Sequence, residues 1–175
     1  MVMLIGKQFV IMCVFIFSAR CSHVSQTKSN VAGCRDNWVT YDGSCYLFGH
    51  HRLTFTEAEH FCRLYNSHLV HIDNSFENTF IKDHIRYTIN PNDRWWIGLT
   101  DEVVENDWRW LDTDTRPTFT DWYHGEPNNN GGVGEENCAV INNREGYKWN
   151  DISCTYSYRP ICEIREGKST TGIFG

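Results

Sequence analysis

The chain has 175 residues, with 22 acidic against 16 basic side chains and a formal net charge of −6 at pH 7. That length suits one domain with short extensions. The acidic balance argues against nucleic acid as a partner, because nucleic-acid binding relies on Lys and Arg side chains that neutralise phosphates. It fits a solvated surface, or carboxylates that hold a cation.

The first 21 residues have the pattern of a secretory signal peptide. Lys7 precedes an apolar run from Phe9 to Phe17, and the small residues Ser18 and Ala19 follow. This order is typical of secretory signals, and the run is shorter than the ~20 apolar residues of a membrane span. A buried or anchoring N-terminal helix is the alternative. We predict cleavage after position 21, and a secreted, extracellular protein without a membrane span.

Cleavage would leave 14 basic against 22 acidic residues, a formal charge of −8, and would remove two of the eight cysteines. An even number of cysteines in a secreted chain predicts three disulfide bridges, without indicating which cysteines pair. Zinc bound by cysteine is the alternative, but the chain has no C-x2-C pair. The remaining cysteines are Cys34, Cys45, Cys62, Cys138, Cys154 and Cys162.

Composition divides the mature chain into a polar leader at 22–33, one compact domain at 34–164 and a polar tail at 165–175. The domain begins with a predicted hairpin, because Trp38–Phe48 alternates aromatic and polar residues around Asp42-Gly43.

A first helix is predicted over Thr54–Leu69. Thr54 and Glu57 form a capping box, and the helical spacing of the apolar residues points Cys62 into the core. A second helix is predicted over Asn74–Tyr87, with Asn74 as its cap. Its apolar face would contain Phe76, Phe80, Ile81, His84 and Ile85.

Short strands follow the helices. Arg94–Leu99 is apolar and aromatic, and "CAVI" and "YRPICEI" predict further short strands. Two helices followed by short strands and long loops predict an α+β domain. We expect the tryptophans to lie mainly in the core, because large aromatic side chains supply much of the buried area of a small domain.

The segment Gly125–Val140, "GEPNNNGGVGEENCAV", is rich in side-chain oxygens and has no apolar periodicity. Long loops in compact domains are usually functional, and calcium takes six to eight oxygen ligands. The candidate ligands are Glu126, Asn128, Glu136 and, at a predicted strand end, Asn150 and Asp151. A cis bond at Glu126-Pro127 would bring the side chains of Glu126 and Asn128 to the same side. A trans turn proline is the alternative.

A second acidic cluster lies at "TDEVVEN". Its carboxylates, together with amides of the long loop, could hold another cation, although a solvated acidic turn is the alternative. It lacks the spacing of an EF-hand. The candidate ligands are Asp101, Glu105, Asn129 and Asn137.

An enzyme is not predicted. Histidines are numerous, but the chain contains no H-E-x-x-H motif, no G-x-S-x-G motif and no reactive Cys–His signature.

The stretch from Cys34 to Glu163 resembles the C-type lectin domain in its long form, which has an extra N-terminal bridge. Each matching motif is weak alone, but their order and spacing together are specific. They are "GSCY" (43–46), the helix ending in Cys62, "WIGL" (96–99), Trp108 and Trp110, "GEPN" (125–128), Cys138, "WNDISC" (149–154) and Cys162.

The resemblance implies an α+β C-type lectin fold, in which two helices flank two small antiparallel sheets and a long loop binds calcium. It implies the pairs Cys34–Cys45, Cys62–Cys162 and Cys138–Cys154. It also implies that Glu126, Asn128, Glu136, Asn150 and Asp151 hold a sugar-bridging Ca2+. The positions of a second calcium site fall on Asp101, Glu105, Asn129 and Asn137, and its two asparagines predict weaker binding.

Family members with Glu-Pro-Asn usually prefer mannose, fucose, glucose or N-acetylglucosamine. The resemblance therefore implies recognition of microbial or cell-surface glycans, for example in innate immunity, with homo-oligomers giving avidity. It is greatest to single-domain secreted lectins of invertebrates, including the perlucin type. The alternative is a partner other than sugar, such as a protein or a shell mineral matrix.

Overall fold

The structure is a computed structural model that describes residues 33–88, 92–132 and 135–165. The predicted signal peptide, the leader before Gly33 and the tail after Arg165 lie outside these residues. Within the described ranges, no helix has both the length and the apolar character that crossing a membrane requires.

The predicted hairpin is confirmed. Strands β1 (Val39–Tyr41) and β2 (Ser44–Phe48) pair antiparallel. The φ angles of Asp42 and Gly43 are 45° and 81°, and positive φ at both central residues is what a two-residue hairpin turn requires. Strand β2 continues the sheet by pairing with β8 (Arg159–Arg165).

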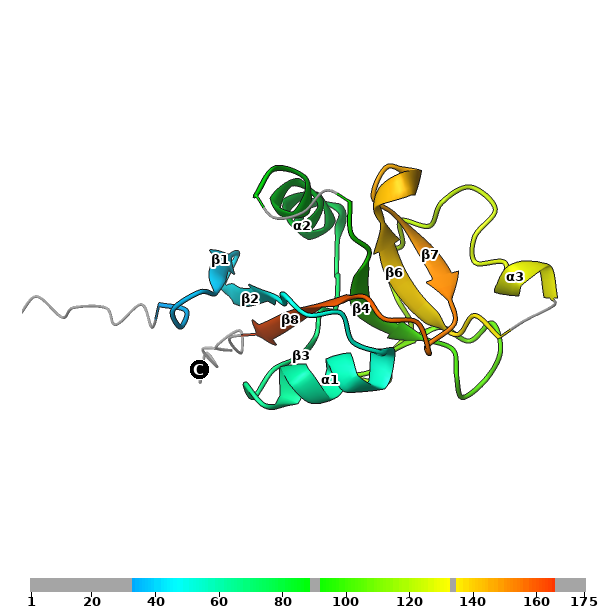
Figure 1. The fold of residues 1–175 in the computed structure, drawn as a ribbon, viewed down its shortest axis with the longest axis horizontal. Helices are drawn as coiled ribbons and strands as arrows, with labels where there is room; N and C mark the ends of the chain where they lie inside the picture. Colours follow the sequence, from blue (N-terminus) through cyan, green and yellow to red (C-terminus); the bar gives the residue numbers. More distant parts are fainter. Residues whose placement is uncertain (1–32, 89–91, 133–134, 166–175) are drawn as a thin grey trace, which may run out of the picture. The chain divides into compact units, whose positions relative to one another are not determined.

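A second antiparallel group follows, made of β4 (Trp95–Thr100), β5 (Arg109–Trp110), β6 (Cys138–Asn142) and β7 (Lys148–Ile152). Strand β8 pairs in parallel with the start of β4. The two sheets are therefore joined by one shared strand, in the order β1-β2-β8-β4-β6-β7. In Figure 1, α1 and α2 lie on opposite sides of these strands.

Helix α1 spans Phe55–Arg63, and its capping box is confirmed. The Thr54 N–H donates to the Glu57 carboxylate over 2.9 Å. The helix ends six residues earlier than predicted, because the chain turns through Asn66 with a positive φ of 55°. That turn directs His68–Leu69 onto β8 as the short strand β3.

Helix α2 spans Ser75–Thr88, and the Asn74 side chain caps it by accepting from the N–H groups of Phe76 and Glu77, both at 3.0 Å. Ile81 and Ile85 are fully buried. The prediction for Phe76 is wrong, since its side chain is 78% exposed. Phe76 precedes Ile81 by five residues and so points about 140° away from it around the helix.

Two hydrophobic clusters occupy the two faces of the sheet, because successive strand residues point to opposite sides. On β4, Trp95 and Ile97 join the cluster that includes Ile81 of α2, whereas Trp96 joins the cluster that includes Ala58 and Cys62 of α1. Four tryptophans are essentially inaccessible, which confirms their predicted place in the core: Trp95, Trp96, Trp110 and Trp149.

The three disulfide pairs implied by the family resemblance are confirmed: Cys34–Cys45, Cys62–Cys162 and Cys138–Cys154. The second bridge fastens α1 to β8. The third bridge joins the start of β6 to the segment just after β7. These bridges use all six cysteines of the domain, so the alternative of zinc bound by cysteine is wrong.

Gly98 lies where two backbones meet in the centre of β4. A Cβ atom at this position would lie 2.7 Å from the carbonyl oxygen of Leu69. Overpacking of this kind typically lowers stability by about 1–3 kcal/mol. We therefore expect Gly98→Ala to lower the free energy of unfolding in urea by that amount. Gly33→Ala is the control, because nothing lies within 4 Å of its added Cβ; equal stability of the two variants would contradict the prediction.

Candidate metal and ligand site

The long loop is held against β7 at its first residues. The N–H of Trp149 donates to the carbonyl of Asp121 over 2.9 Å, and the N–H of Tyr123 donates to the carbonyl of Trp149 over 2.8 Å. Trp122 and Trp149 form a parallel β-bridge. This pairing brings Glu126 and the residues after it beside the end of β7, so the predicted ligands from the loop and from the strand meet.

The peptide bond between Glu126 and Pro127 is cis, which decides between the two alternatives that the sequence left open. The side-chain amide of Asn128 donates a hydrogen bond to the Glu126 carboxylate. The two side chains that flank Pro127 therefore lie on the same side of the loop, close enough to act on one ligand.

Asp151 lies at the centre of the arrangement and is 2% exposed. Its Oδ2 accepts from the backbone N–H groups of Asn128 at 2.9 Å and Asn129 at 2.7 Å. Its Oδ1 is buried and has no hydrogen-bond partner among the described residues. Asn150 precedes it on β7, opposite Val140 of β6. One oxygen of the Asp151 carboxylate thus holds the loop, while the other oxygen is available to a ligand.

Glu136 closes the loop from its other end. Its carboxylate accepts from the N–H of Asn130 over 2.7 Å, and its own N–H donates to the side-chain oxygen of Asn129 over 2.8 Å. Burial raises the pKa of Glu136, and the charge of Asp151 acts in the same direction, against the Asn130 hydrogen bond. The site therefore concentrates negative charge that a cation would neutralise.

The second predicted cluster is partly assembled. Asp101 is 4% exposed, and its Oδ2 accepts from the N–H of Asn106 over 2.9 Å. The Asn137 carbonyl accepts from the Thr100 hydroxyl over 2.6 Å and from the Asp101 N–H over 3.2 Å, which brings Asp101 and Asn137 together. Burial raises the pKa of Asp101, and nearby Glu105 and Asp151 act in the same direction. Glu105 itself is exposed.

Three unpartnered oxygens in these clusters are of the chemical kind that a calcium ion takes as ligands. In the described part of the chain, every buried side-chain oxygen without a hydrogen bond belongs to one of the two clusters: Asp101 Oδ1, Asn137 Oδ1 and Asp151 Oδ1. Leaving a buried acceptor unsatisfied costs about 1–3 kcal/mol. Calcium prefers carboxylate and amide oxygens and would satisfy all three.

The proposed carboxylate ligands have not converged on one point. Among the described residues, the carboxylates of Glu126, Glu136 and Asp151 do not form a group within 4.8 Å of one another. The first two carboxylates are held by the hydrogen bonds to Asn128 and Asn130 given above. Both side chains would turn toward Asp151 to complete a calcium site.

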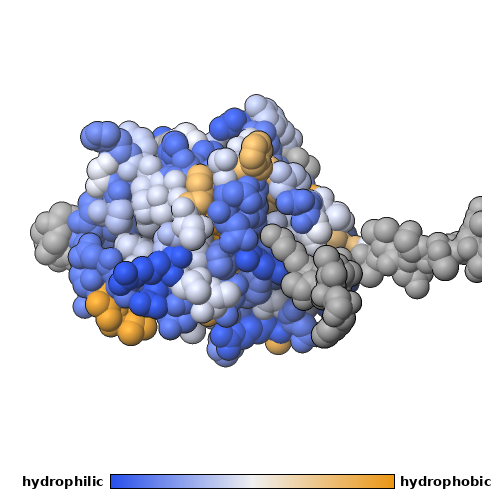
Figure 2. Space-filling model, turned by 180° about the vertical axis from the view of Figure 1, so that it is seen from behind, coloured by the Kyte–Doolittle hydropathy of each residue, from blue (hydrophilic) through white to orange (hydrophobic). Residues whose placement is uncertain are grey.

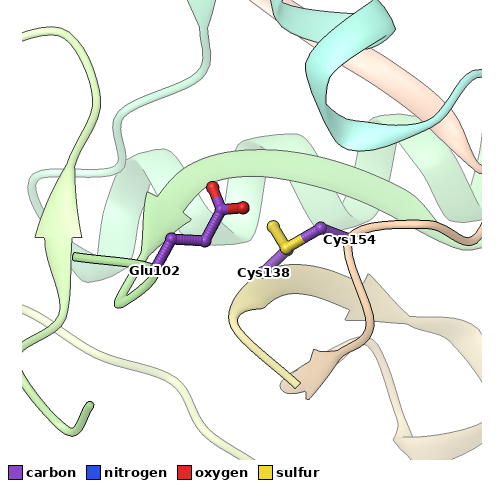
Figure 3. A group of neighbouring side chains, drawn as sticks. All are labelled: Glu102, Cys138 and Cys154. Atoms are coloured by element: carbon purple, nitrogen blue, oxygen red, sulfur yellow. A yellow bond between two sulfur atoms is a disulfide. The ribbon is translucent and has the colours of Figure 1, made fainter. Parts of the chain in front are cut away.

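A different group of described side chains does have its ligand atoms within 4.8 Å of one another, but this group cannot hold a metal. Figure 3 shows Glu102 beside Cys138 and Cys154. The two sulfur atoms are bonded to each other, so neither is a thiolate, and thiolate is the form of cysteine that binds metals.

Asp121 is a supporting residue that the sequence did not reveal. Its carboxylate accepts from Asn78 and Lys82 of α2, both at 2.7 Å, and from Lys148 of β7. Burial alone would raise the pKa of Asp121, but these hydrogen bonds hold it below its usual range. The network fixes the start of the loop to α2 and to the strand that carries Asn150. Its partners are far apart in the chain, so no local pattern could have identified it.

Comparison with known proteins agrees with this fold. Residues 51–164 match the family model described as the lectin C-type domain. The hepatic lectin of Gallus gallus is 41% identical over 127 residues, which are 72% of this chain and 57% of that protein. The mouse scavenger receptor C-type lectin carbohydrate-recognition domain is 36% identical with a TM-score of 0.69, over 77% of this chain and 100% of that one.

A third similar structure is the cow CD23 carbohydrate-recognition domain in the presence of GlcNAc2Man3 oligosaccharide. It is 28% identical, with a TM-score of 0.67 over 77% of this chain and 97% of that one. The chain belongs to the C-type lectin domain family. Domains of this family generally bind calcium and are generally not enzymes. The chain spans about half the length of the first curated relatives it matches.

Proposed function

We propose that this chain binds carbohydrate through a calcium ion held by side chains of the long loop and of β7. The ligands would be Glu126, Asn128, Glu136, Asn150 and Asp151. The observation that carries the proposal is the buried and unpartnered Oδ1 of Asp151, because its other oxygen already fastens the loop. The convergence of loop and strand on that carboxylate supports a ligand site there.

When bound, calcium would coordinate two neighbouring hydroxyl oxygens of a sugar. The side chains then read the orientation of those hydroxyls. The carboxylates of Glu126 and Glu136 accept from them, while the amides of Asn128 and Asn150 donate to them. Hydrogen bonds to charged groups are the stronger kind. Because the sugar only replaces water, we expect a Kd near ~1 mM for a monosaccharide, about −4 kcal/mol.

We propose mannose-type sugars, including fucose and N-acetylglucosamine, as the ligands. The Glu-Pro-Asn sequence at 126–128 supports this choice by resemblance to family members with that preference. The oligosaccharide named for the CD23 domain contains both mannose and N-acetylglucosamine. A weak single site would need clustering to be useful, so we propose that several copies act together on extracellular glycans, for example in innate immunity.

A second calcium ion at Asp101, Glu105, Asn129 and Asn137 is part of this proposal. The buried oxygens of Asp101 and Asn137 support it. Asn129, which we propose as a ligand of the second ion, is hydrogen-bonded to residues of the first site: its side-chain oxygen accepts from the N–H of Glu136 and its own N–H donates to Asp151. Occupancy of the second site would therefore help to order the first.

Exchange of the two residues around Pro127 tests the sugar preference. Glu126→Gln combined with Asn128→Asp moves the charge and reverses the order of donor and acceptor groups that face the hydroxyls. We expect binding to shift from mannose toward galactose by at least about tenfold, roughly 1.4 kcal/mol. The measurement is retention on mannose–agarose and galactose–agarose in calcium, followed by elution with a chelator.

Glu135→Gln is the matched control, because this exposed neighbour is not a proposed ligand. It should leave retention unchanged. If the folded, calcium-loaded protein is not retained on mannose, fucose, N-acetylglucosamine or galactose, the sugar proposal fails and a mineral or protein partner takes its place.

A further inference from the structure

A cavity of about 290 Å³ that no proposed calcium ligand lines contains three arginines in its wall. They are Arg52, Arg94 and Arg144, and one carboxylate, Asp93, lies among them. The remaining lining residues, Asn92, Asn143 and Tyr158, carry no negative charge at neutral pH. Such a basic cavity is unexpected in a chain whose net charge is −6.

Asp93 forms ion pairs within the cavity wall, and these pairs already compensate its negative charge. The carboxylate is 2% exposed. One oxygen pairs with Arg52 Nη2 at 2.7 Å, and the other pairs with Arg159 Nε at 2.5 Å. Arg94 and Arg144 therefore add positive charge that Asp93 does not neutralise. A guanidinium has five N–H donors, so Arg52 can hold Asp93 and still donate to a ligand.

Arg94 is held in place by an aromatic support. Its Nη1 lies 2.9 Å from the hydroxyl oxygen of Tyr158, and its guanidinium lies 5.4 Å from the centre of that ring. The Tyr158 ring packs edge-on against buried Trp96 at 5.2 Å. The backbone of Tyr158 pairs with that of Leu53 in both directions, at 2.8 and 2.9 Å. Groups positioned in advance in this way lose little entropy when a ligand binds.

The cavity and the proposed calcium site lie at different ends of one hairpin. Arg144 lies in the turn that joins β6 to β7. Glu136 precedes β6, and Asp151 lies near the end of β7. A five-residue strand is about 17 Å long, so Arg144 lies well away from Asp151, whereas the charge of Arg94 reaches Glu136 and acts to lower its pKa. No proposed calcium ligand lines the cavity, so removal of calcium should leave the arginines in place.

The planar guanidinium group matches oxyanions through two parallel hydrogen bonds. The cavity is near the lower end of the range of small-molecule sites, about 300–1,000 Å³. We infer that Arg52, Arg94 and Arg144 form a second, calcium-independent site for the sulfate or phosphate ester of an acidic saccharide. The saccharide part of this inference rests on the proposed function, whereas the anion site is inferred from the arginines alone.

The test is NMR titration of the full chain with glucose 6-sulfate, glucose 6-phosphate and glucose, with a chelator in excess. The chelator makes the result independent of the calcium-bridged sugar site. We expect one or both esters to shift the resonances of the cavity residues, and glucose to leave them unchanged. Raised salt should weaken the binding, because the arginines are partly open to solvent. The tighter ester identifies sulfated or phosphorylated saccharides as the ligand class.

Arg144→Glu is the main variant, because Arg144 is exposed and its replacement should not disturb folding. We expect at least tenfold weaker binding of the ester, and a similar loss for Arg94→Gln. Arg63→Glu makes the same change of charge on α1, at a side chain that is 68% exposed, and should bind like the wild type. If neither ester shifts the cavity resonances, or Arg144→Glu binds as tightly as Arg63→Glu, the inference is wrong.

Discussion

Asp151→Asn is expected to abolish most of the rise in melting temperature that calcium gives the wild-type protein. A cation at one hundred times its Kd stabilises a folded protein by about 2.7 kcal/mol, which corresponds to several degrees for a domain of this size. The substitution removes the central negative charge of the proposed site. Calcium affinity depends on the number of charged ligands, so we expect it to fall by about 100-fold. Thermal unfolding with and without calcium measures this directly.

Without calcium, the same variant should be no less stable than the wild type. Asparagine can still accept the two N–H bonds that fasten the loop, and the substitution removes a buried charge with one unpartnered oxygen. Asp114→Asn is the control, because the Asp114 side chain is 86% exposed and lies outside both clusters. A variant that loses stability equally with and without calcium would show that Asp151 is structural only.

Removal of the Cys62–Cys162 bridge is expected to cause the largest loss of stability. The bridge closes a loop with a sequence separation of 100 residues, whereas Cys34–Cys45 closes one of 11. In the chain-entropy account, the long loop corresponds to about 4.7 kcal/mol and a short loop to about 3 kcal/mol. Replacement of both members of each pair by alanine, followed by urea denaturation, compares the two bridges.

The burial of Cys62 and Cys162 increases the expected difference in stability between the two variants. Cys62 and Cys162 are both fully inaccessible and lie in the cluster under α1, so their removal also leaves a small cavity. We expect the variant without Cys62–Cys162 to unfold at clearly lower urea than the variant without Cys34–Cys45. The opposite order would mean that the N-terminal hairpin stabilises the domain more than the link between α1 and β8.

Features that depend on neighbouring residues were predictable from the sequence. The Thr54–Glu57 capping box, the Asp42-Gly43 turn and the buried tryptophans all occur as predicted. Each depends on local backbone preference or on the size of a side chain. The cis bond before Pro127 was favoured by the two polar residues that flank it, but the sequence left a trans turn open as the alternative.

Features that depend on distant residues were not predictable in the same way. The pairing of the six cysteines came from the family resemblance, because their spacing alone left the choice open. The end of α1 was misplaced, since the helical pattern continues past Arg63 while pairing with β8 makes His68–Leu69 a strand. The Asp121 network joins α2, the loop and β7, and only the folded chain brings these segments together.

The division of the fold into a packed framework and an added loop has a consequence for how such a domain can diversify. No described residue from 123 to 137 belongs to either hydrophobic cluster. The loop is fastened at its base by Trp149, Asp121 and the Cys138–Cys154 bridge. Residues between these attachments can therefore be exchanged without repacking the interior, so selection can alter what the loop recognises while folding stays nearly constant.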